Sequence, residues 1–403
     1  MKDLIHDWNA ERAPARPPHR IEFDDETLRD GLQSPSVTQP TVAQKLEILR
    51  LIDALGVDTA DIGLPGAGEA AKADTLAIAR AMADEKMRVT GNCAARTLEA
   101  DLAPIAEIAQ KTGRPLAAAM FIGSSPIRLY AEDWTIDTLV EHTRRATTFA
   151  VKNGIEVMYV TEDTTRARPG DLERLFLTAV ECGATRLCLC DTCGHATPSG
   201  AQALVRWTRK LLDDRNLGHV KIDWHGHMDR GLGVWNAVAA AEAGAHRLHG
   251  TALGVGERVG NAPLDQILVN LKLLGWIDLD LRPLADYCRK VSAYTGVPIP
   301  HGYPVVGKDA FETATGTHAA AILKAARKGD AWLADRVYSG VPAADFGRSQ
   351  EIAIGPLSGK SNVLWWLERR GLPATDAAVA AVLERAKRSS RVLTDDEIRE
   401  ALP

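Results

Sequence analysis

Two histidines separated by one residue, His225 and His227, open the segment HGHMDRGLGVWNAVAAAEAGA, residues 225–245. The preceding run, VKIDWHGH from residue 220, has the composition of a buried strand. Residues i and i+2 of a strand point the same way, so both imidazoles can reach one metal ion. Polar residues are also common at strand ends. The spacing alone therefore leaves a metal ligand and a merely polar strand end about equally open.

Other polar residues that can do chemistry also follow short apolar runs. They are Arg29 and Asp30 after IEFDD, Glu162 in IEVMYVTED, Thr192 after TRLCLCD, and Asn261 after HRLHGTALG. Two imidazoles and the carboxylate of Asp30 suit a borderline divalent ion and leave coordination positions open for a substrate. A metal-dependent amidohydrolase also uses two such histidines, but at its first strand, whereas here they follow the seventh strand-like run.

The elements that would position these residues alternate along the chain. Eight strand-like runs begin near residues 21, 57, 87, 116, 155, 185, 220 and 246, with helix-like stretches between them. Several of these stretches close on a glycine typical of a helix C-cap, as at Gly56, Gly154, Gly183 and Gly244. A doubly wound sheet also alternates in this way. The count of eight over roughly 250 residues, and the acidic DDETLRDG in place of a glycine-rich nucleotide turn, favour a (β/α)8 TIM barrel.

The pattern predicts four parts of the chain. Residues 1–20, rich in Pro and Arg, are expected to form a flexible arm, and residues 21–285 the catalytic barrel. Residues 286–345 are expected to be a linker and subdomain, and residues 346–403 a small, mostly helical C-terminal subdomain. Thr394, three residues before Glu397, is typical of a capping box that starts the last helix.

Composition limits the class of protein. The net charge is −5, with 45% hydrophobic and 25% charged residues, which gives no electrostatic case for a nucleic-acid or anionic membrane partner. We find no apolar run long enough to span a bilayer and no signal-peptide pattern, so a cytoplasmic location is expected. Six cysteines do not suggest a disulfide framework, and Cys188, Cys190 and Cys193 are expected to be small buried residues at a strand end rather than metal ligands.

Four segments, in order, resemble the motifs of the 2-isopropylmalate synthase and homocitrate synthase family, part of the DRE-TIM metallolyase superfamily. They are DETLRDGLQ, HGHMDRGLGVWNAVAAAEAGA, GTALGVGERVGNAPLDQ and FETATGTHAAAILK, and the resemblance covers residues 20 to 360. It implies a TIM barrel followed by small subdomains. It also implies an acyltransferase that condenses acetyl-CoA with a 2-oxo acid and then hydrolyses the thioester to give a 2-substituted malate.

The resemblance also implies roles for individual residues. A divalent metal, with Zn, Mg and Mn all open, would be bound by Asp30, His225 and His227, with Asn261 as an extra ligand. Arg29 would hold the oxo group and Thr192 the carboxylate of the 2-oxo acid. The catalytic residues would be Arg29, the acid Glu162, the base His318 and, beside it, Tyr338. In the family the last two reach the active site of the other subunit, which implies a homodimer.

The chain departs from the family at Leu32, Ala119, Arg128 and Met228. Many members of the family have Glu, Asn or His at or near these positions. The 2-oxo acid therefore stays open. A 2-isopropylmalate synthase-like enzyme is the main interpretation, with homocitrate, citramalate, Re-citrate and phosphonomethylmalate synthases as alternatives. A C–C lyase of the HMG-CoA lyase type is disfavoured because GVGERVGNA has no cysteine, and a non-catalytic barrel because the polar residues are retained. No room remains for a large leucine-binding domain, so leucine inhibition through one is not expected.

Overall fold

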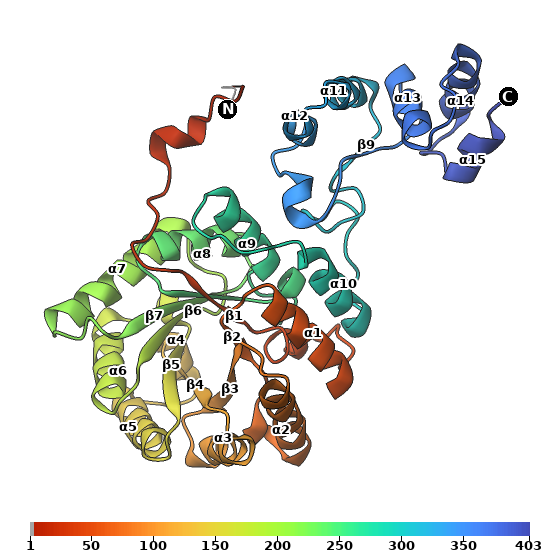
Figure 1. Cartoon of the computed structure of the whole chain (residues 1–403). Coiled ribbons are helices and arrows are strands. Elements are labelled where there is room, and N and C mark those ends of the chain that lie inside the picture. Colours follow the sequence, from red (N-terminus) through yellow and green to blue (C-terminus); the bar gives the residue numbers. More distant parts are fainter. Residues whose placement is uncertain (1–3) are drawn as a thin grey trace. The chain divides into compact units, whose positions relative to one another are not determined.

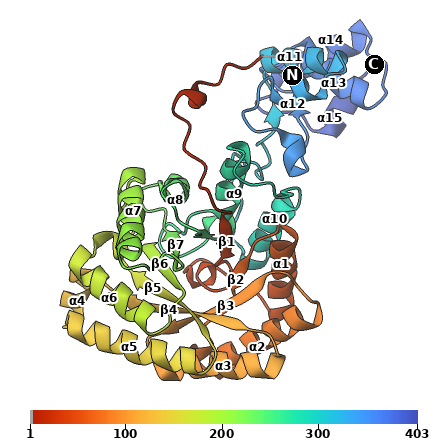
Figure 2. The same cartoon turned by 60° about the vertical axis from the view of Figure 1, so that its left-hand side comes forward.

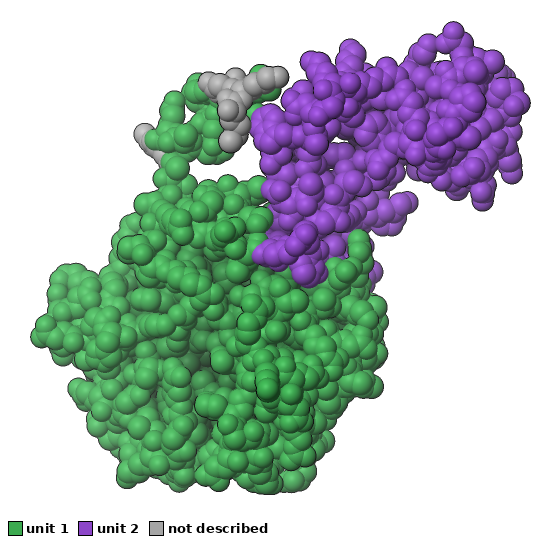
Figure 3. Space-filling model, in the orientation of Figure 1, with its two compact units in different colours: residues 1–279, 286–297 green, residues 280–285, 298–403 purple. Residues whose placement is uncertain are grey.

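The computed structural model describes residues 4–403, so the first three residues of the predicted arm lie outside the described part. The chain divides into two compact units (Figure 3). Unit 1 comprises Met1–Leu279 with Asp286–Val297, and unit 2 comprises Asp280–Ala285 with Pro298–Pro403. A further boundary at residue 345 stays a prediction.

Unit 1 is a closed barrel of eight parallel strands in sequence order (Figures 1 and 2). β1 closes the barrel by pairing with β8, with Asp24 opposite His249. The predicted TIM barrel is thus confirmed. Seven strands lie within their predicted runs, and the third begins in its run, MRVTGN from residue 87, but extends beyond it to Arg96. The strands are β1 (Glu22–Asp25), β2 (Thr59–Asp61), β3 (Thr90–Arg96), β4 (Leu116–Gly123), β5 (Glu156–Glu162), β6 (Arg186–Asp191), β7 (Lys221–Gly226) and β8 (Arg247–Gly250).

The helices of unit 1 form the outer layer of the barrel (Figure 1). The first helix begins at Val42, after the N-cap residue Thr41, which forms a capping box with Gln44. Gly56, at a φ of 77°, follows the helix. None of the described helices is both long and apolar enough to cross a membrane. The helices are α1 (Val42–Ala54), α2 (Glu69–Asp84), α3 (Glu99–Thr112), α4 (Pro126–Ala131), α5 (Ile136–Lys152), α6 (Pro169–Glu181), α7 (Pro198–Asp214), α8 (Gly233–Glu242), α9 (Leu264–Leu273) and α10 (Leu284–Thr295).

A buried ionic network ties β6, β7 and β8 together. Asp223 accepts hydrogen bonds from Arg186 Nη1 at 2.6 Å and from Arg247 Nη2 at 2.6 Å. His249 Nε2 lies 3.3 Å from the same carboxylate. All four side chains are buried, so the two guanidinium groups have little access to water. Asp223 is paired with both of them, and Glu22 also accepts a hydrogen bond from Arg186 Nη2.

Asp223→Asn is expected to lower the free energy of unfolding by about 3 kcal/mol or more. Arg247 would stay buried without its carboxylate partner, and Arg186 would keep only its ion pair with Glu22. Denaturant unfolding followed by circular dichroism measures this change. The matched control is Asp213→Asn, which removes a helix-surface ion pair with Arg209 and should cost less than about 1 kcal/mol. Equal unfolding free energies for the two variants would contradict the importance of the network.

Unit 2 contains a two-stranded parallel sheet and helices packed on their own apolar core. The core includes Val363, Trp366, Val382 and Ile398. The predicted capping box is present, with the Thr394 side chain accepting from the Glu397 backbone N–H. The elements are β9 (Glu312–Thr313), α11 (Gly316–Arg327), α12 (Ala331–Arg336), β10 (Glu351–Ile352), α13 (Lys360–Arg369), α14 (Asp376–Arg388) and α15 (Asp395–Glu400).

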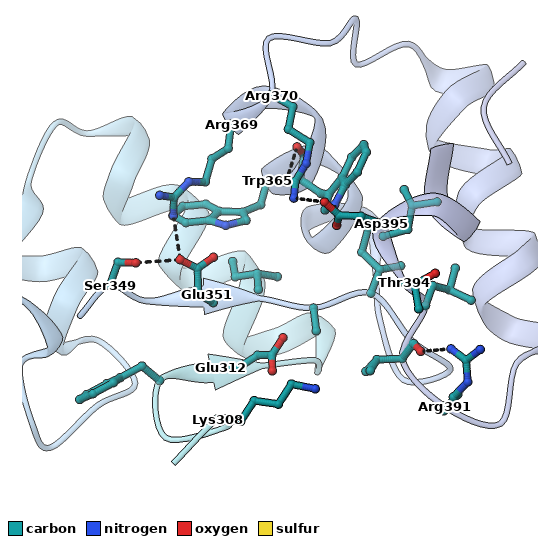
Figure 4. Close-up of a pocket in the computed structure, with 18 of the residues that line it drawn as sticks. Lys308, Glu312, Ser349, Glu351, Trp365, Arg369, Arg370, Arg391, Thr394 and Asp395 are labelled. Atoms are coloured by element: carbon teal, nitrogen blue, oxygen red, sulfur yellow. Dashed lines mark hydrogen bonds and ion pairs between the residues drawn. The ribbon is translucent and has the colours of Figure 1, made fainter. Parts of the chain in front are cut away.

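A cavity of about 930 Å³ opens within unit 2 (Figure 4). Arg369 lies over the ring of Trp365, and its Nη1 is 3.8 Å from Glu351 Oε1. Arg370 Nη2 donates to Asp395 Oδ2 at 2.6 Å. These charges on the cavity wall are therefore compensated by neighbours within the same unit.

Candidate active site

One cavity at the carboxyl ends of the barrel strands brings six of the predicted site residues together. It has a volume of about 220 Å³. Active sites of TIM barrels lie at this end, because the loops that follow the strands converge there. The six predicted residues that line it are Arg29, Asp30, Glu162, Thr192, His225 and His227.

The two histidines and the aspartate lie close enough together to hold one metal ion. Asp30 Oδ2 lies 4.0 Å from His225 Nε2 and 3.8 Å from His227 Nε2. Ligand atoms of all three residues lie within 4.8 Å of one another, and all three residues are buried. Atoms that each lie about 2.0–2.2 Å from a zinc-sized ion are at most about 4.4 Å apart. The separations of 4.0 and 3.8 Å therefore fit a divalent ion between the three groups.

Glu26 orients His225. Its Oε2 lies 2.6 Å from His225 Nδ1, which leaves Nε2 to face Asp30. Its other oxygen lies 3.0 Å from Nδ1 of the fully buried His249. A carboxylate behind a histidine ligand fixes the tautomer and makes the ring nitrogen a stronger donor to a metal. Sequence reasoning missed Glu26, although an acid directly after the first strand, inside DETLRDG, was a usable signal.

Asn261 reaches the site through a tight glycine loop. Its backbone forms a β-bridge with His227, and its Nδ2 donates to Asp30 Oδ2 at 2.6 Å. Gly260 precedes it at a φ of 101°, where an added Cβ would lie 1.9 Å from Gly254 O. Asn261 Oδ1 is buried without a hydrogen-bond partner. The amide as placed positions Asp30, and its role as a metal ligand stays a prediction.

Arg29 is held as a fixed positive charge. Its Nε donates to Asp61 Oδ2 at 2.6 Å and its Nη1 to Asp30 Oδ1 at 2.8 Å. Burial opposes its charge, but Asp61, Asp30 and Glu26 more than offset this and raise the pKa of Arg29. The guanidinium is therefore charged at every physiological pH. Asp61, at the end of β2, is a second supporting residue that sequence reasoning missed.

Glu162 and Thr192 face the cavity from the ends of β5 and β6. Burial raises the pKa of Glu162, with Arg128 and Arg29 partly offsetting the shift. Thr192 Oγ1 accepts the backbone N–H of Asp163 at 2.8 Å and keeps its own O–H for a ligand. Glu162 thus presents to the cavity a carboxyl group that holds a proton more readily than usual, and Thr192 presents a hydroxyl hydrogen that can be donated.

His318 and Tyr338 form a pair of their own in unit 2. Their ring centroids lie 4.0 Å apart at an interplanar angle of 26°. Both residues are exposed, and His318 lies in the first turn of α11. The pairing of the two predicted catalytic side chains is an observation of this structure. Their action in the site of a second subunit stays a prediction.

Glu26→Gln is expected to weaken metal affinity about 10- to 100-fold, because the amide orients His225 less firmly and donates less electron density to it. Competition with a chromophoric chelator measures the affinity. Glu257→Gln changes an exposed acid on the wall of the same cavity and should leave affinity within about twofold. An unchanged affinity in Glu26→Gln would remove the supporting role assigned to Glu26.

The fold and the site together define a class of protein. A closed eight-stranded barrel carries two histidines, a carboxylate and an arginine at the carboxyl ends of its strands. This is the arrangement of a TIM-barrel enzyme whose active site has side chains that can bind a metal ion.

Comparison with known proteins gives the family. The model of the HMGL-like family matches residues 20–291, and the chain belongs to this family. The chain is 33% identical over 390 residues to homocitrate synthase AksA of Methanopyrus kandleri, covering 95% of this chain and 92% of that protein. It is 32% identical to a probable 2-isopropylmalate synthase of the same organism, covering 92% of this chain and 70% of that one. The resemblance stated from the motifs is confirmed.

Among solved structures, the HMG-CoA lyase of Bacillus subtilis matches with a TM-score of 0.59 at 20% sequence identity. The match covers 71% of this chain and 97% of the lyase. At this identity the likeness supports the barrel fold alone.

Proposed function

We propose that this enzyme condenses acetyl-CoA with a 2-oxo acid and hydrolyses the resulting thioester to a 2-substituted malate. The observation that carries the proposal is the cluster of Asp30, His225 and His227 beside Arg29, in a chain whose relatives are named 2-isopropylmalate and homocitrate synthases. We propose a divalent metal and acetyl-CoA as cofactor and cosubstrate, a homodimer as the assembly, and a cytoplasmic location.

Asp30, His225 and His227 would hold the ion, with its identity open among Zn, Mg and Mn. When bound, such an ion supplies Lewis-acid polarisation of a carbonyl oxygen. Arg29 would lie where negative charge develops on the former oxo oxygen, and its fixed geometry needs no reorganisation during the reaction. Thr192 would donate its hydroxyl hydrogen to the substrate carboxylate.

The condensation requires a base that removes a proton from the acetyl methyl group. We assign this role to His318, with Tyr338 stacked against it, supplied by a second subunit. The resulting carbon nucleophile forms a C–C bond with the oxo carbon, whose oxygen takes up a proton. Glu162 would carry protons at this stage. Water then cleaves the thioester, giving the new carboxylate and coenzyme A with a free thiol.

A 2-isopropylmalate synthase-like reaction is our main proposal. Homocitrate, citramalate, Re-citrate and phosphonomethylmalate synthesis are the alternatives with other 2-oxo acids. A lyase that breaks a C–C bond is less favoured, since relatives at 30% identity or more carry synthase names, whereas the lyase likeness is one of fold.

The test is release of free thiol from acetyl-CoA across a panel of 2-oxo acids, with and without a chelator. Release that depends on one class of 2-oxo acid, disappears after chelation and returns with added Zn, Mg or Mn is the expected result. The ion that restores release identifies the metal. Absence of release with every acid and every metal would contradict the proposal.

A further inference from the structure

A second cavity adjoins the active-site cavity at the carboxyl ends of β3, β4 and β5, which are neighbours in the barrel (Figure 2). Its volume is about 250 Å³. Phe121 and Glu162 line both cavities, so these two side chains form the shared wall. Most of its exposed lining surface is apolar, from residues such as Leu98, Ile122, Trp134 and Leu139. The polar residues that also line it are Arg96, Thr97, Arg128, Thr138 and His142.

The cations at the second cavity already have partners. Arg96 donates from Nε and Nη2 to the two carboxylate oxygens of Asp101, at 2.8 and 2.9 Å. Arg128 Nη2 lies 3.0 Å from Glu132 Oε1, and its guanidinium lies 5.8 Å from the ring centroid of Trp134. Glu162, on the shared wall, would repel an entering carboxylate. The cavity therefore favours an apolar group over an anionic one.

The active-site cavity leads from the metal ligands towards this apolar space. Between the histidines and Phe121 its wall is formed by Ala119, Met158, Val160 and Cys190, and these residues offer no charge. Ala119 and Cys190 are small, buried side chains that line this part of the cavity. Ligand sites usually have about 300–1,000 Å³, a range that the active-site cavity alone does not reach and that the two cavities together do.

We propose that the second cavity is a subsite for the apolar tail of the 2-oxo acid, which makes the preferred substrate a monocarboxylic 2-oxo acid with an extended alkyl or aryl side chain. This inference rests on the proposed function. The head group binds at Asp30, His225 and His227, the chain runs past Ala119, and its end passes Phe121 into the pocket beneath Trp134. Each buried methylene group should add about fourfold to kcat/KM.

The first test measures kcat/KM of the metal-loaded enzyme by thiol release with 2-oxobutyrate, 2-oxohexanoate, 2-oxooctanoate and phenylpyruvate. 2-Oxoglutarate and 2-oxoadipate provide acidic tails of similar length. We expect kcat/KM to rise at least tenfold from the four-carbon to the longer apolar acids, and the acidic tails to be poorer than apolar ones of equal length.

The second test fills the subsite. Thr138, in the first turn of α5, lines the second cavity and not the first. Thr138→Phe should lower kcat/KM for 2-oxooctanoate at least tenfold and change that for 2-oxobutyrate less than twofold. Glu141→Phe, an exposed position of the same helix outside both cavities, should change neither value.

The outcomes separate the two proposals. If none of the 2-oxo acids supports thiol release, the proposed function is overturned. Release with short acids only, or preferentially with 2-oxoglutarate or 2-oxoadipate, would overturn the subsite and leave the function standing. Equal loss for short and long acids in Thr138→Phe would also count against the subsite. If Thr138→Phe does not fold, the chain-length series of the unaltered enzyme decides alone.

Discussion

His225→Ala is expected to lose bound metal and to lower kcat about a thousandfold or more. The substitution removes a predicted metal ligand, whose Nε2 lies 4.0 Å from Asp30 Oδ2, and leaves the carboxylate of Glu26 without its partner at 2.6 Å. A bound ion contributes several kcal/mol of transition-state stabilisation, which corresponds to a rate effect of about this size. Metal content by elemental analysis and thiol release with the preferred 2-oxo acid measure the two effects.

The matched control is His195→Ala, since His195 is an exposed histidine in the loop that follows β6 and does not line the active-site cavity. This variant should keep its metal and its activity within about twofold. A fully active His225→Ala variant would contradict the assignment of the metal site. Loss of activity with full metal content would instead give His225 a role other than ligation.

Arg29→Ala is expected to lower kcat about 10²- to 10³-fold while metal remains bound, because one fixed donor to a developing oxyanion has roughly this effect. The buried carboxylate of Asp61 would also lose its partner at 2.6 Å, so circular dichroism and metal content must accompany the kinetics. Arg29→Lys keeps the charge but not the two-pronged geometry, and should recover only part of the rate.

Arg258→Ala is the comparison for Arg29. Arg258 lines the same cavity, but its guanidinium pairs with Asp229 at 2.9 Å and 41% of its side chain is exposed. It should cost less than about tenfold, because an exposed charge is screened by solvent. A larger loss in Arg258→Ala than in Arg29→Ala would transfer the oxyanion role to Arg258.

The fold was predictable because its signals are local. The composition of the strand-like runs and their alternation with helix-like stretches mark all eight strands. The glycines expected at helix C-caps, Gly56, Gly154, Gly183 and Gly244, all adopt a positive φ. Closure into a barrel follows once eight parallel strands are counted. The placement of α10 with the barrel, at Asp286–Val297, depends on long-range packing that the sequence pattern does not express.

The site was predictable where one strand end determines the geometry. His225 and His227 share a face because they are two residues apart, and β1 brings Asp30 to them because it closes the barrel. Glu26 and Asp61 were missed because their role is to orient other side chains. The apolar cavity beside Phe121 arises from three strand ends and α5 together, a juxtaposition that only the folded barrel defines.

The most direct test of the account is the fate of labelled acetyl-CoA. The metal-loaded enzyme would be incubated with [¹³C₂]acetyl-CoA and its preferred 2-oxo acid, and the products followed by ¹³C NMR. The account predicts a new 2-hydroxy dicarboxylic acid with label in its CH₂ and adjoining carboxylate, and none after chelation. Label appearing only in free acetate would show thioester hydrolysis without C–C bond formation and would contradict the account.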